Sequence, residues 1–186
     1  MGFLTSLGLA IPAGLNAYIP LLAVAVANHF GWLRLRAPFD LLGSWWVIGV
    51  IIVLLVVEMI ADKVPAVDHV NDVIQTVVRP AAGGLLFVAA SPQASNVNPW
   101  LLVVAGVIVA GGVHAVKATT RPVVNASTAG LGAPIVSTIE DVLAGITAVL
   151  AIVAPYLVAA VVLLVVAVVA RMYVVRRRKR VIASAA

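Results

Sequence analysis

Long apolar stretches alternate with short polar ones along the whole chain. Six stretches stand out, with approximate bounds 3–30, 44–61, 70–90, 99–116, 127–154 and 156–175. A helix needs roughly 20 predominantly apolar residues to cross the hydrocarbon layer of a bilayer. The pattern therefore predicts an all-α, polytopic membrane protein with about six transmembrane helices.

Broken or re-entrant elements are expected, because the first, third and fifth stretches are interrupted by proline, glycine or charge. In the fifth, small and polar residues occupy 125–134, and residues 137–140 (Ser-Thr-Ile-Glu) have the form of a capping box, which begins a helix. We favour a break within the membrane that lines a wet cavity, as in transporters. The alternative is a cytoplasmic loop followed by a helix that starts late.

An internal hairpin repeat is a further hypothesis. Residues 8–12 and 130–134 share the pattern Gly-Leu-x-x-Pro, and a polar residue, Asn16 or Thr138, follows each at the same distance. The second, fourth and sixth stretches open with Trp or Tyr, which favour the membrane interface. A sequence rich in valine and alanine also produces such matches by chance.

The composition excludes an ordinary soluble domain. Hydrophobic residues make up 63% of the 186 residues and charged residues only 10%, whereas about a quarter of a soluble domain is charged. We expect one helical transmembrane domain over residues 1–175 and a basic cytoplasmic tail over 176–186. Cysteine is absent, which excludes disulfides and thiolate chemistry, and the chain has no nucleotide-binding or zinc-protease motif. We therefore expect no cofactor and no enzymatic activity.

Basic residues predict the orientation. The run at 171–180 adjoins an apolar stretch, which favours contact with anionic lipid headgroups over nucleic acid. Cytoplasmic ends of membrane helices are rich in Lys and Arg. Six spans with both termini in the cytoplasm, in the plasma membrane, would leave only two basic residues on the outer side, Arg34 and Arg36.

Four acidic residues are the main candidates for an ion-binding site. Glu58 and Asp62 are four residues apart and share a helix face, and Glu140 and Asp141 fall in the first turn of the predicted late helix. Carboxylates within a membrane persist when they are paired, face water, or carry ions or protons. We expect the four to converge, although a solvated turn with a salt bridge to Lys63 would also explain the first pair.

Other polar residues fit supporting roles. Asn16 and Thr138 are candidate neutral ligands, and Lys63, His114 and Lys117 are candidates for balancing charge. His114 would pair with a carboxylate or shuttle protons. Lys117, together with Arg121, would alternatively extend to the membrane interface. The pattern does not identify a metal.

Several short motifs resemble one family of bacterial membrane proteins, grouped as domain of unknown function 4126. The motifs are Ala-Gly-Leu-Asn-Ala at 13–17 followed by Pro-Leu-Leu at 20–22, Glu58 with 62–65 (Asp-Lys-Val-Pro) and Asp68, Arg79-Pro80 with Gly83, and the glycine-rich stretch that ends in Glu140-Asp141. The resemblance covers most of the chain. It implies a helical membrane architecture and the same polar residues, but no activity.

Three functions compete on these grounds. The first is a transporter or channel that moves a cation, a proton or a small polar solute by means of intramembrane carboxylates. The second is a non-catalytic accessory subunit, within a larger membrane complex or a homo-oligomer. The third is an enzyme acting on lipid with His114 and the carboxylates as acid and base, which is the weakest because no catalytic constellation is visible.

Overall fold

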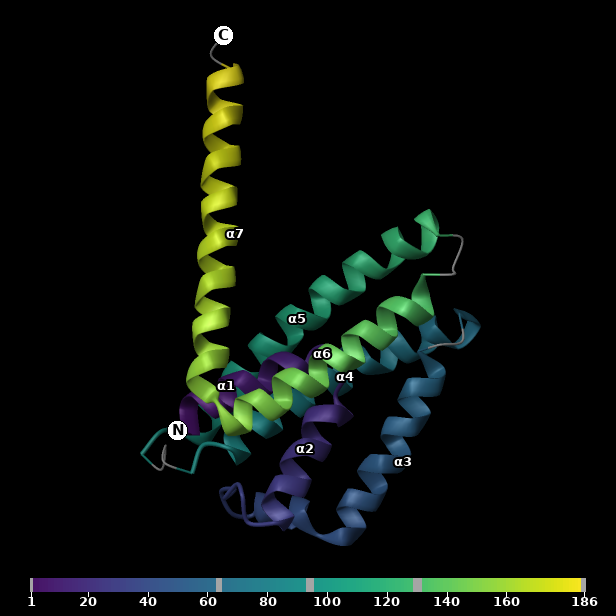
Figure 1. Ribbon diagram of the computed structural model, residues 1–186, viewed down its shortest axis with the longest axis vertical. Coiled ribbons are helices and arrows are strands. Elements are labelled where there is room, and N and C mark those ends of the chain that lie inside the picture. The colour runs from purple at the N-terminus through teal and green to yellow at the C-terminus, as the bar shows by residue number, and fades with distance from the viewer. Residues whose placement is uncertain (1, 63–64, 93–95, 129–131, 185–186) are drawn as a thin grey trace.

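All regular structure in the described part of the chain is helical. The computed structural model describes residues 2–62, 65–92, 96–128 and 132–184. The elements, shown in Figure 1, are α1 (Gly2–Ala13), α2 (Tyr18–His29), the 3-10 helix η1 (Phe39–Gly43), α3 (Trp45–Ala61), α4 (Pro65–Ala89), α5 (Pro99–Ser127), α6 (Ala133–Val153) and α7 (Pro155–Ser184). The prediction of an all-α membrane protein is confirmed.

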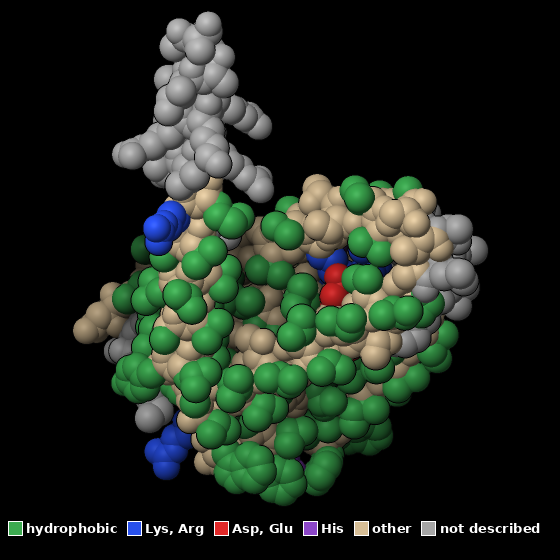
Figure 2. Space-filling model, turned by 45° about the horizontal axis from the view of Figure 1, so that its top comes forward, with side chains coloured by type: hydrophobic (Ala, Val, Ile, Leu, Met, Phe, Trp, Pro, Cys, Tyr) green, Lys and Arg blue, Asp and Glu red, His purple; other side chains and the backbone are tan. Residues whose placement is uncertain are grey.

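Three helices are long and apolar enough to cross a membrane unaided. They cover Pro99–Val124 in α5, Ala133–Val153 in α6 and Pro155–Tyr173 in α7. The helices α1, α2 and α3 and the Val73–Ala89 part of α4 are apolar but shorter. Hydrophobic side chains cover most of the visible surface in Figure 2, as expected for helices embedded in lipid.

Helix boundaries depart from the apolar stretches where polar residues are buried. Helix α4 begins at Pro65 and α5 continues to Ser127, so both extend well beyond their apolar parts. Pro80 and Pro122 lie inside these helices without ending them. Helix α7 continues to Ser184, so no helix end marks the expected division after residue 175. Hydropathy indicates which residues contact lipid. A helix can extend beyond those residues where neighbouring helices satisfy its polar side chains.

The first apolar stretch is two short helices and not one span. Helix α1 ends after Pro12, and the turn at residues 14–17 separates it from α2. The Asn16 Oδ1 accepts hydrogen bonds from the backbone N–H groups of Tyr18 (3.0 Å) and Ile19 (3.1 Å), which satisfies the start of α2. Each helix has 12 residues and is about 18 Å long, roughly half the thickness of a bilayer.

The two short helices form a re-entrant hairpin, because both outer ends lie beside the C-terminal end of α4. Ser6 Oγ lies 2.6 Å from Ser91 Oγ, and the backbone N–H of Arg36 donates to Ala89 O at 2.9 Å. The break at Asn16 lies between them along the chain and inside the bundle, where Asn16 is 1% exposed. The chain therefore enters the bundle in α1 and returns to the same end in α2 (Figure 1).

Small residues let the hairpin and its neighbours approach closely. Helices α4 and α5 meet at Gly83 and Gly106, where a Cβ on either glycine would overlap the other helix. Gly14, in the hairpin turn, lies against Ala110 of α5 in the same way. The hydrophobic core around these contacts includes the fully buried Leu9 of α1. Close packing of this kind is the main source of helix association in lipid.

The hairpin changes the expected topology. If α3 to α7 each cross the membrane once, the number of crossings is odd and the termini lie on opposite sides. We expect a tag at the N-terminus to be accessible from the same side as Asp40→Cys, and Ser184→Cys to be labelled from the other side. The cysteine-free sequence makes such labelling specific. If the N-terminal tag and Ser184→Cys were accessible from the same side, the result would contradict the hairpin. The first segment would then span the membrane.

The glycine contact between α4 and α5 predicts a stability difference. Gly83→Val should lower the free energy of unfolding by about 1–3 kcal/mol, because the new side chain overlaps Ala110 and Gly106. Gly112→Ala is the control, since no atom lies within 4 Å of a Cβ there. Thermal unfolding in detergent measures both. Equal melting temperatures would show that close approach at Gly83 is not required.

Candidate functional site

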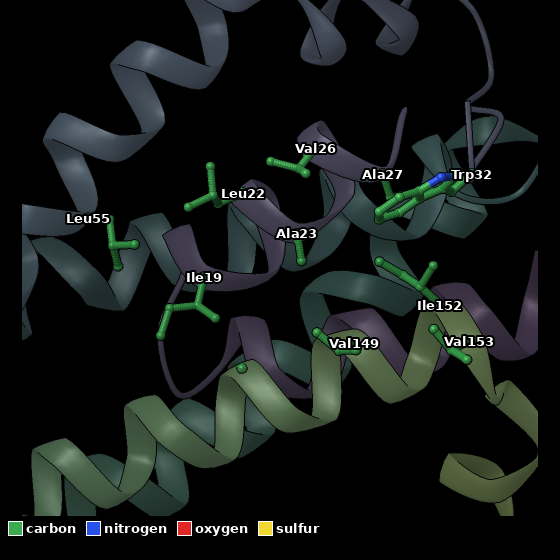
Figure 3. A pocket seen from close by; sticks show the side chains of 11 residues that line it. Ile19, Leu22, Ala23, Val26, Ala27, Trp32, Leu55, Val149, Ile152 and Val153 are labelled. Atoms are coloured by element: carbon green, nitrogen blue, oxygen red, sulfur yellow. The ribbon is translucent and has the colours of Figure 1, made fainter. Parts of the chain in front are cut away.

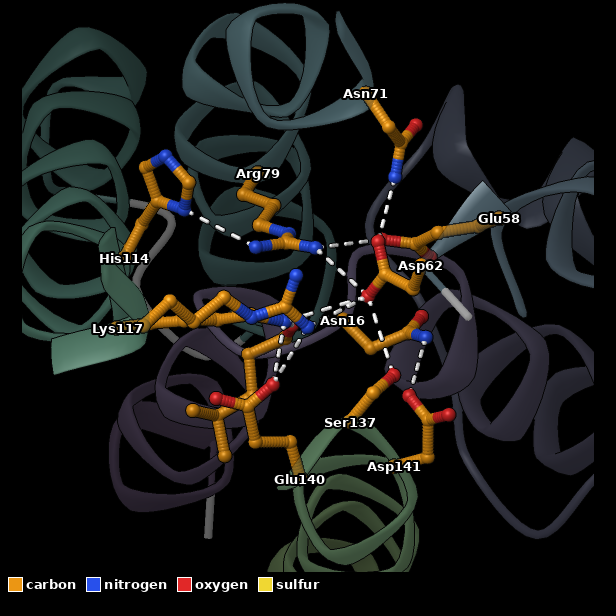
Figure 4. Close-up of polar contacts among 12 residues, drawn as sticks. Asn16, Glu58, Asp62, Asn71, Arg79, His114, Lys117, Ser137, Glu140 and Asp141 are labelled. Carbon is orange, nitrogen blue, oxygen red and sulfur yellow. Dashed lines mark hydrogen bonds and ion pairs between the residues drawn. The ribbon is translucent and has the colours of Figure 1, made fainter. Parts of the chain in front are cut away.

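Four helices bring their polar faces together next to the hairpin break (Figure 4). The helical spacing of three or four residues puts the polar side chains of each helix on one face. Glu58 and Asp62 come from the end of α3, and Asn71, Gln75 and Arg79 are spaced by four residues on α4. The other contributors are His114, Lys117 and Arg121 of α5 and Ser137, Glu140 and Asp141 of α6.

Arg79 occupies the deepest position. Its side chain is fully buried, and its Nη2 atom lies 3.0 Å from Glu58 Oε1 and 3.7 Å from Asp62 Oδ2. The opposite Nη1 atom lies 3.2 Å from His114 Nδ1. Because arginine only donates, this ring nitrogen must accept, and His114 is neutral with its proton on Nε2, facing Thr76 Oγ1 at 3.2 Å. Arg79 therefore links α3 to α5.

Two further bases bridge α3 to α6. Lys117 Nζ lies 2.9 Å from Glu140 Oε2 and 3.6 Å from Asp62 Oδ2. Arg121 Nη2 lies 3.0 Å from the same Glu140 oxygen and 3.1 Å from the same Asp62 oxygen. Each base thus contacts both carboxylates. Asp62 in addition accepts a hydrogen bond from Asn71 Nδ2 at 2.6 Å.

These residues form a charge network, a name used below for three acids and three bases: Glu58, Asp62, Glu140, Arg79, Lys117 and Arg121. Their formal charges cancel. All six side chains are at most 12% exposed. Separating charges in so dry a setting is costly, so the ion pairs constrain how the helices pack.

The network is open to one end of the bundle and closed toward the middle. Glu140 and Arg121 are 12% and 7% exposed, whereas Glu58 and Arg79 are 1% and 0% exposed. Figure 2 shows acidic and basic atoms inside a hollow in the otherwise hydrophobic surface. A polar species arriving from this end would meet Glu140 and Arg121 first.

Two side-chain hydrogen bonds hold the hairpin break, one to the network residue Lys117 and one to the neighbouring Asp141. Lys117 Nζ donates to the backbone carbonyl oxygen of Leu15 at 2.7 Å. Asn16 Nδ2 donates to Asp141 Oδ1 at 2.9 Å, while Asn16 Oδ1 accepts from the first turn of α2. The backbone groups freed by the break are therefore satisfied by network and neighbouring side chains, as buried irregular backbone requires.

Most of the sequence-predicted residues meet here. The structure brings together Glu58, Asp62, Glu140 and Asp141 with Asn16, His114 and Lys117. Lys63 lies outside the described residues. Asn16 cannot also serve as an open ligand, because its amide already binds Asp141 and α2.

Thr138 does not join the site. It is exposed and donates back to Pro134 O at 2.7 Å. The predicted capping box is wrong, because α6 begins at Ala133, with Pro134 in its first turn. Ser137 faces inward instead, and its Oγ lies 3.5 Å from Asp62 Oδ2. The equivalence of Thr138 with Asn16, one of the matches behind the repeat hypothesis, is therefore absent from the structure.

Helices α5 and α6 are separated where a break was predicted, since α5 ends at Ser127 and α6 starts at Ala133, with residues 129–131 outside the described part. That this separation lies within the membrane stays a prediction. Among the described residues, the turn at 14–17 is an interruption buried inside the bundle.

Sequence reasoning identified only one of the three bases as part of a site. Lys117 was a candidate for balancing charge, whereas Arg121 was considered only at the membrane interface; the two are 3% and 6% exposed and paired. Arg79 appeared there only within a family motif. The spacing of Asn71, Gln75 and Arg79 by four residues was the signal that could have placed Arg79 on an inward face.

The arrangement suits proton exchange better than metal binding. Within the described residues, no group of three or more His, Asp or Glu side chains could hold a metal ion. Each network carboxylate already faces a base, at 3.0 Å for Glu58, 2.9 Å for Glu140 and 3.1 Å for Asp62. A bare cation would have to displace an arginine or lysine.

Fold and site together define a helical membrane protein with a buried, charge-balanced network at a re-entrant hairpin. The model of the family described as Domain of unknown function (DUF4126) matches residues 3–175, and the chain belongs to this family. The match includes all helices up to the middle of α7 and the entire network. No curated protein and no solved structure matches the chain.

The network predicts a large stability cost for losing one partner. Arg79→Met should lower the free energy of unfolding by about 3–5 kcal/mol, because Glu58 keeps a buried charge without its base. The double variant Glu58→Met/Arg79→Met should recover much of that loss. Arg34→Met, at an exposed position, is the control. Unfolding by denaturing detergent measures all four proteins, and an Arg79→Met variant as stable as the control would contradict the pairing.

Proposed function

We propose that this protein is a proton-linked membrane transporter or channel for a small polar solute or ion. One observation carries the proposal: Asp62 and Glu140 share the same two bases, next to a break in a re-entrant hairpin. Shared bases can change partner when one acid takes up a proton. Discontinuous helices are the elements that transporters use to build sites within the membrane.

In the proposed exchange, Lys117 and Arg121 change their carboxylate partner. With both acids ionised, Lys117 lies closer to Glu140 (2.9 Å) than to Asp62 (3.6 Å). Protonation of Glu140 removes its attraction for Lys117 and Arg121, so both bases shift toward Asp62. Lys117 also holds the carbonyl oxygen of Leu15. Its displacement therefore loosens the break and allows the hairpin to move.

The hairpin is suited to act as the moving part. Leu9 and Ala13 of α1, on the N-terminal side of the break, are fully buried. A shift of the hairpin would open that side, while the solute enters through the hollow at Glu140 and Arg121. A proton fits the network better than a metal cation, because the described residues offer no group of three or more acidic or histidine ligands.

Proton flux in reconstituted vesicles tests this function. An imposed pH gradient should dissipate, as followed with an internal pH-sensitive dye, when the wild-type chain is present. Glu140→Gln keeps the side-chain shape but cannot ionise, so flux should fall to that of protein-free vesicles. Asp40→Asn, at an exposed position on η1, is the matched control and should retain flux.

Two results would contradict this proposal. Full flux in Glu140→Gln would reject Glu140 as the exchanging acid. Background flux in the wild-type protein itself, with the fold intact, would reject the transport function and leave the accessory role.

A second function, a non-catalytic accessory subunit, is supported by α7. Its apolar span Pro155–Tyr173 is almost entirely unburied within the chain. The helix leaves the bundle after its first turns and stands apart from the other helices in Figure 1. Such a helix has room on all sides for another membrane protein. Chemical crosslinking in native membranes would reveal a partner or a second copy on α7.

A further inference from the structure

An apolar groove runs along the re-entrant helix α2 (Figure 3). It has a volume of about 330 Å³ and lies between α2, α3 and α6. Its lining includes Ile19 and Val26 of α2, Leu55 of α3, and Gly145 and Val149 of α6. Every lining side chain is aliphatic or aromatic, apart from the glycine, which has none. The groove therefore offers mainly dispersion contacts, and Trp32 is the lining residue that carries a polar atom.

The groove has the length of one membrane leaflet. It begins at Ile19, in the first turn of α2, and reaches Trp32, just beyond the end of that helix. Helix α2 has 12 residues and is about 18 Å long, close to the roughly 15 Å of one leaflet's hydrocarbon. The inner end adjoins the hairpin break, because Ile19 N donates to Asn16 Oδ1.

The outer end has the composition of a lipid-headgroup interface. Trp32 lines the groove there and is 75% exposed. Arg34 follows two residues later in the same loop and is also exposed. Tryptophan favours the boundary between hydrocarbon and headgroups, and arginine binds phosphate.

We propose that this groove is a phospholipid site. It binds one acyl chain of a lipid from the leaflet on the N-terminal side, with the phosphate near Trp32 and Arg34 and the chain end at Ile19 and Gly145. Water does not fill a cavity that lacks polar partners. A helix of a second protein copy, about 10–12 Å across with side chains, is too wide for a groove of this volume.

The bound chain would support the hairpin from its lipid side. The chain end lies against Ile19, which is held by Asn16, and against Gly145, one helical turn from Asp141. Asn16 and Asp141 are bonded to each other at the break. The site is independent of whether the protein transports protons, because it rests on the groove alone.

Gly145→Leu tests the site by filling its inner end. A Cβ at Gly145 meets only Ile19 Cγ2, at the ordinary contact distance of 3.8 Å, so the backbone accommodates a larger residue. Gly112→Leu on α5 is the matched control, because no atom lies within 4 Å of a Cβ there and Gly112 does not line this groove. Both variants add the same side chain to the surface of a helix.

The measurement is phospholipid retained by the full chain. Each protein is extracted in mild detergent from vesicles of phosphatidylethanolamine and phosphatidylglycerol, and native mass spectrometry counts lipids per chain. The wild type and Gly112→Leu should retain one phospholipid, and Gly145→Leu several-fold less. Circular dichroism checks that all three are folded, and Gly145→Ala replaces Gly145→Leu if that variant is not. Equal retention in a folded Gly145 variant, or none in the wild type, would overturn the proposal.

Discussion

Pairing of buried charge is the constraint on which the rest of this structure depends. Arg79, Lys117 and Arg121 carry positive charge in a setting that excludes most water, and an unpaired ion there is strongly destabilising. Each therefore requires a carboxylate from another helix. Because Glu58 and Asp62 come from α3 and Glu140 from α6, satisfying the bases of α4 and α5 holds four helices in one register. The hydrophobic helix surfaces, which lipid solvates equally well, could not specify that register.

The same constraint explains why a broken helix is tolerated at this point. Residues 14–17 leave backbone groups without helical partners, which is costly within a membrane. Lys117 and Asn16 satisfy part of this demand, so the break and the network stabilise each other. Their mutual dependence is also what would make them a switch, because a change of charge in the network alters the hydrogen bonding of the break. The proposed phospholipid groove adjoins the break at Ile19 and would act on the same hairpin from the lipid side.

Much of the architecture was predictable from the chain, because long apolar stretches and intramembrane charges are local signals. Glu58, Asp62, Glu140 and Asp141 stood out since charge is rare in such a sequence, and they do lie together. The position of the buried break was not predictable in the same way. Pro12, Pro80 and Pro122 all lie in helices, yet only Pro12 is the penultimate residue of its helix. The difference depends on whether a neighbouring helix supplies donors and acceptors, which periodicity does not report. Thr138 and Ser137 show a similar limit, since adjacent helix residues point about 100° apart and only the packing of α6 decides which of them faces the site.

Movement of the hairpin on protonation is the most direct test of this account. Spin labels on Arg34→Cys, beyond α2, and Trp100→Cys, at the start of α5, occupy exposed positions. Electron-spin distance measurements in lipid vesicles, at acidic and at alkaline pH, report how α2 lies relative to α5. The account predicts a pH-dependent distance in the wild-type background that no longer changes when Glu140→Gln is added. The same distance at both pH values in the wild-type background would contradict it.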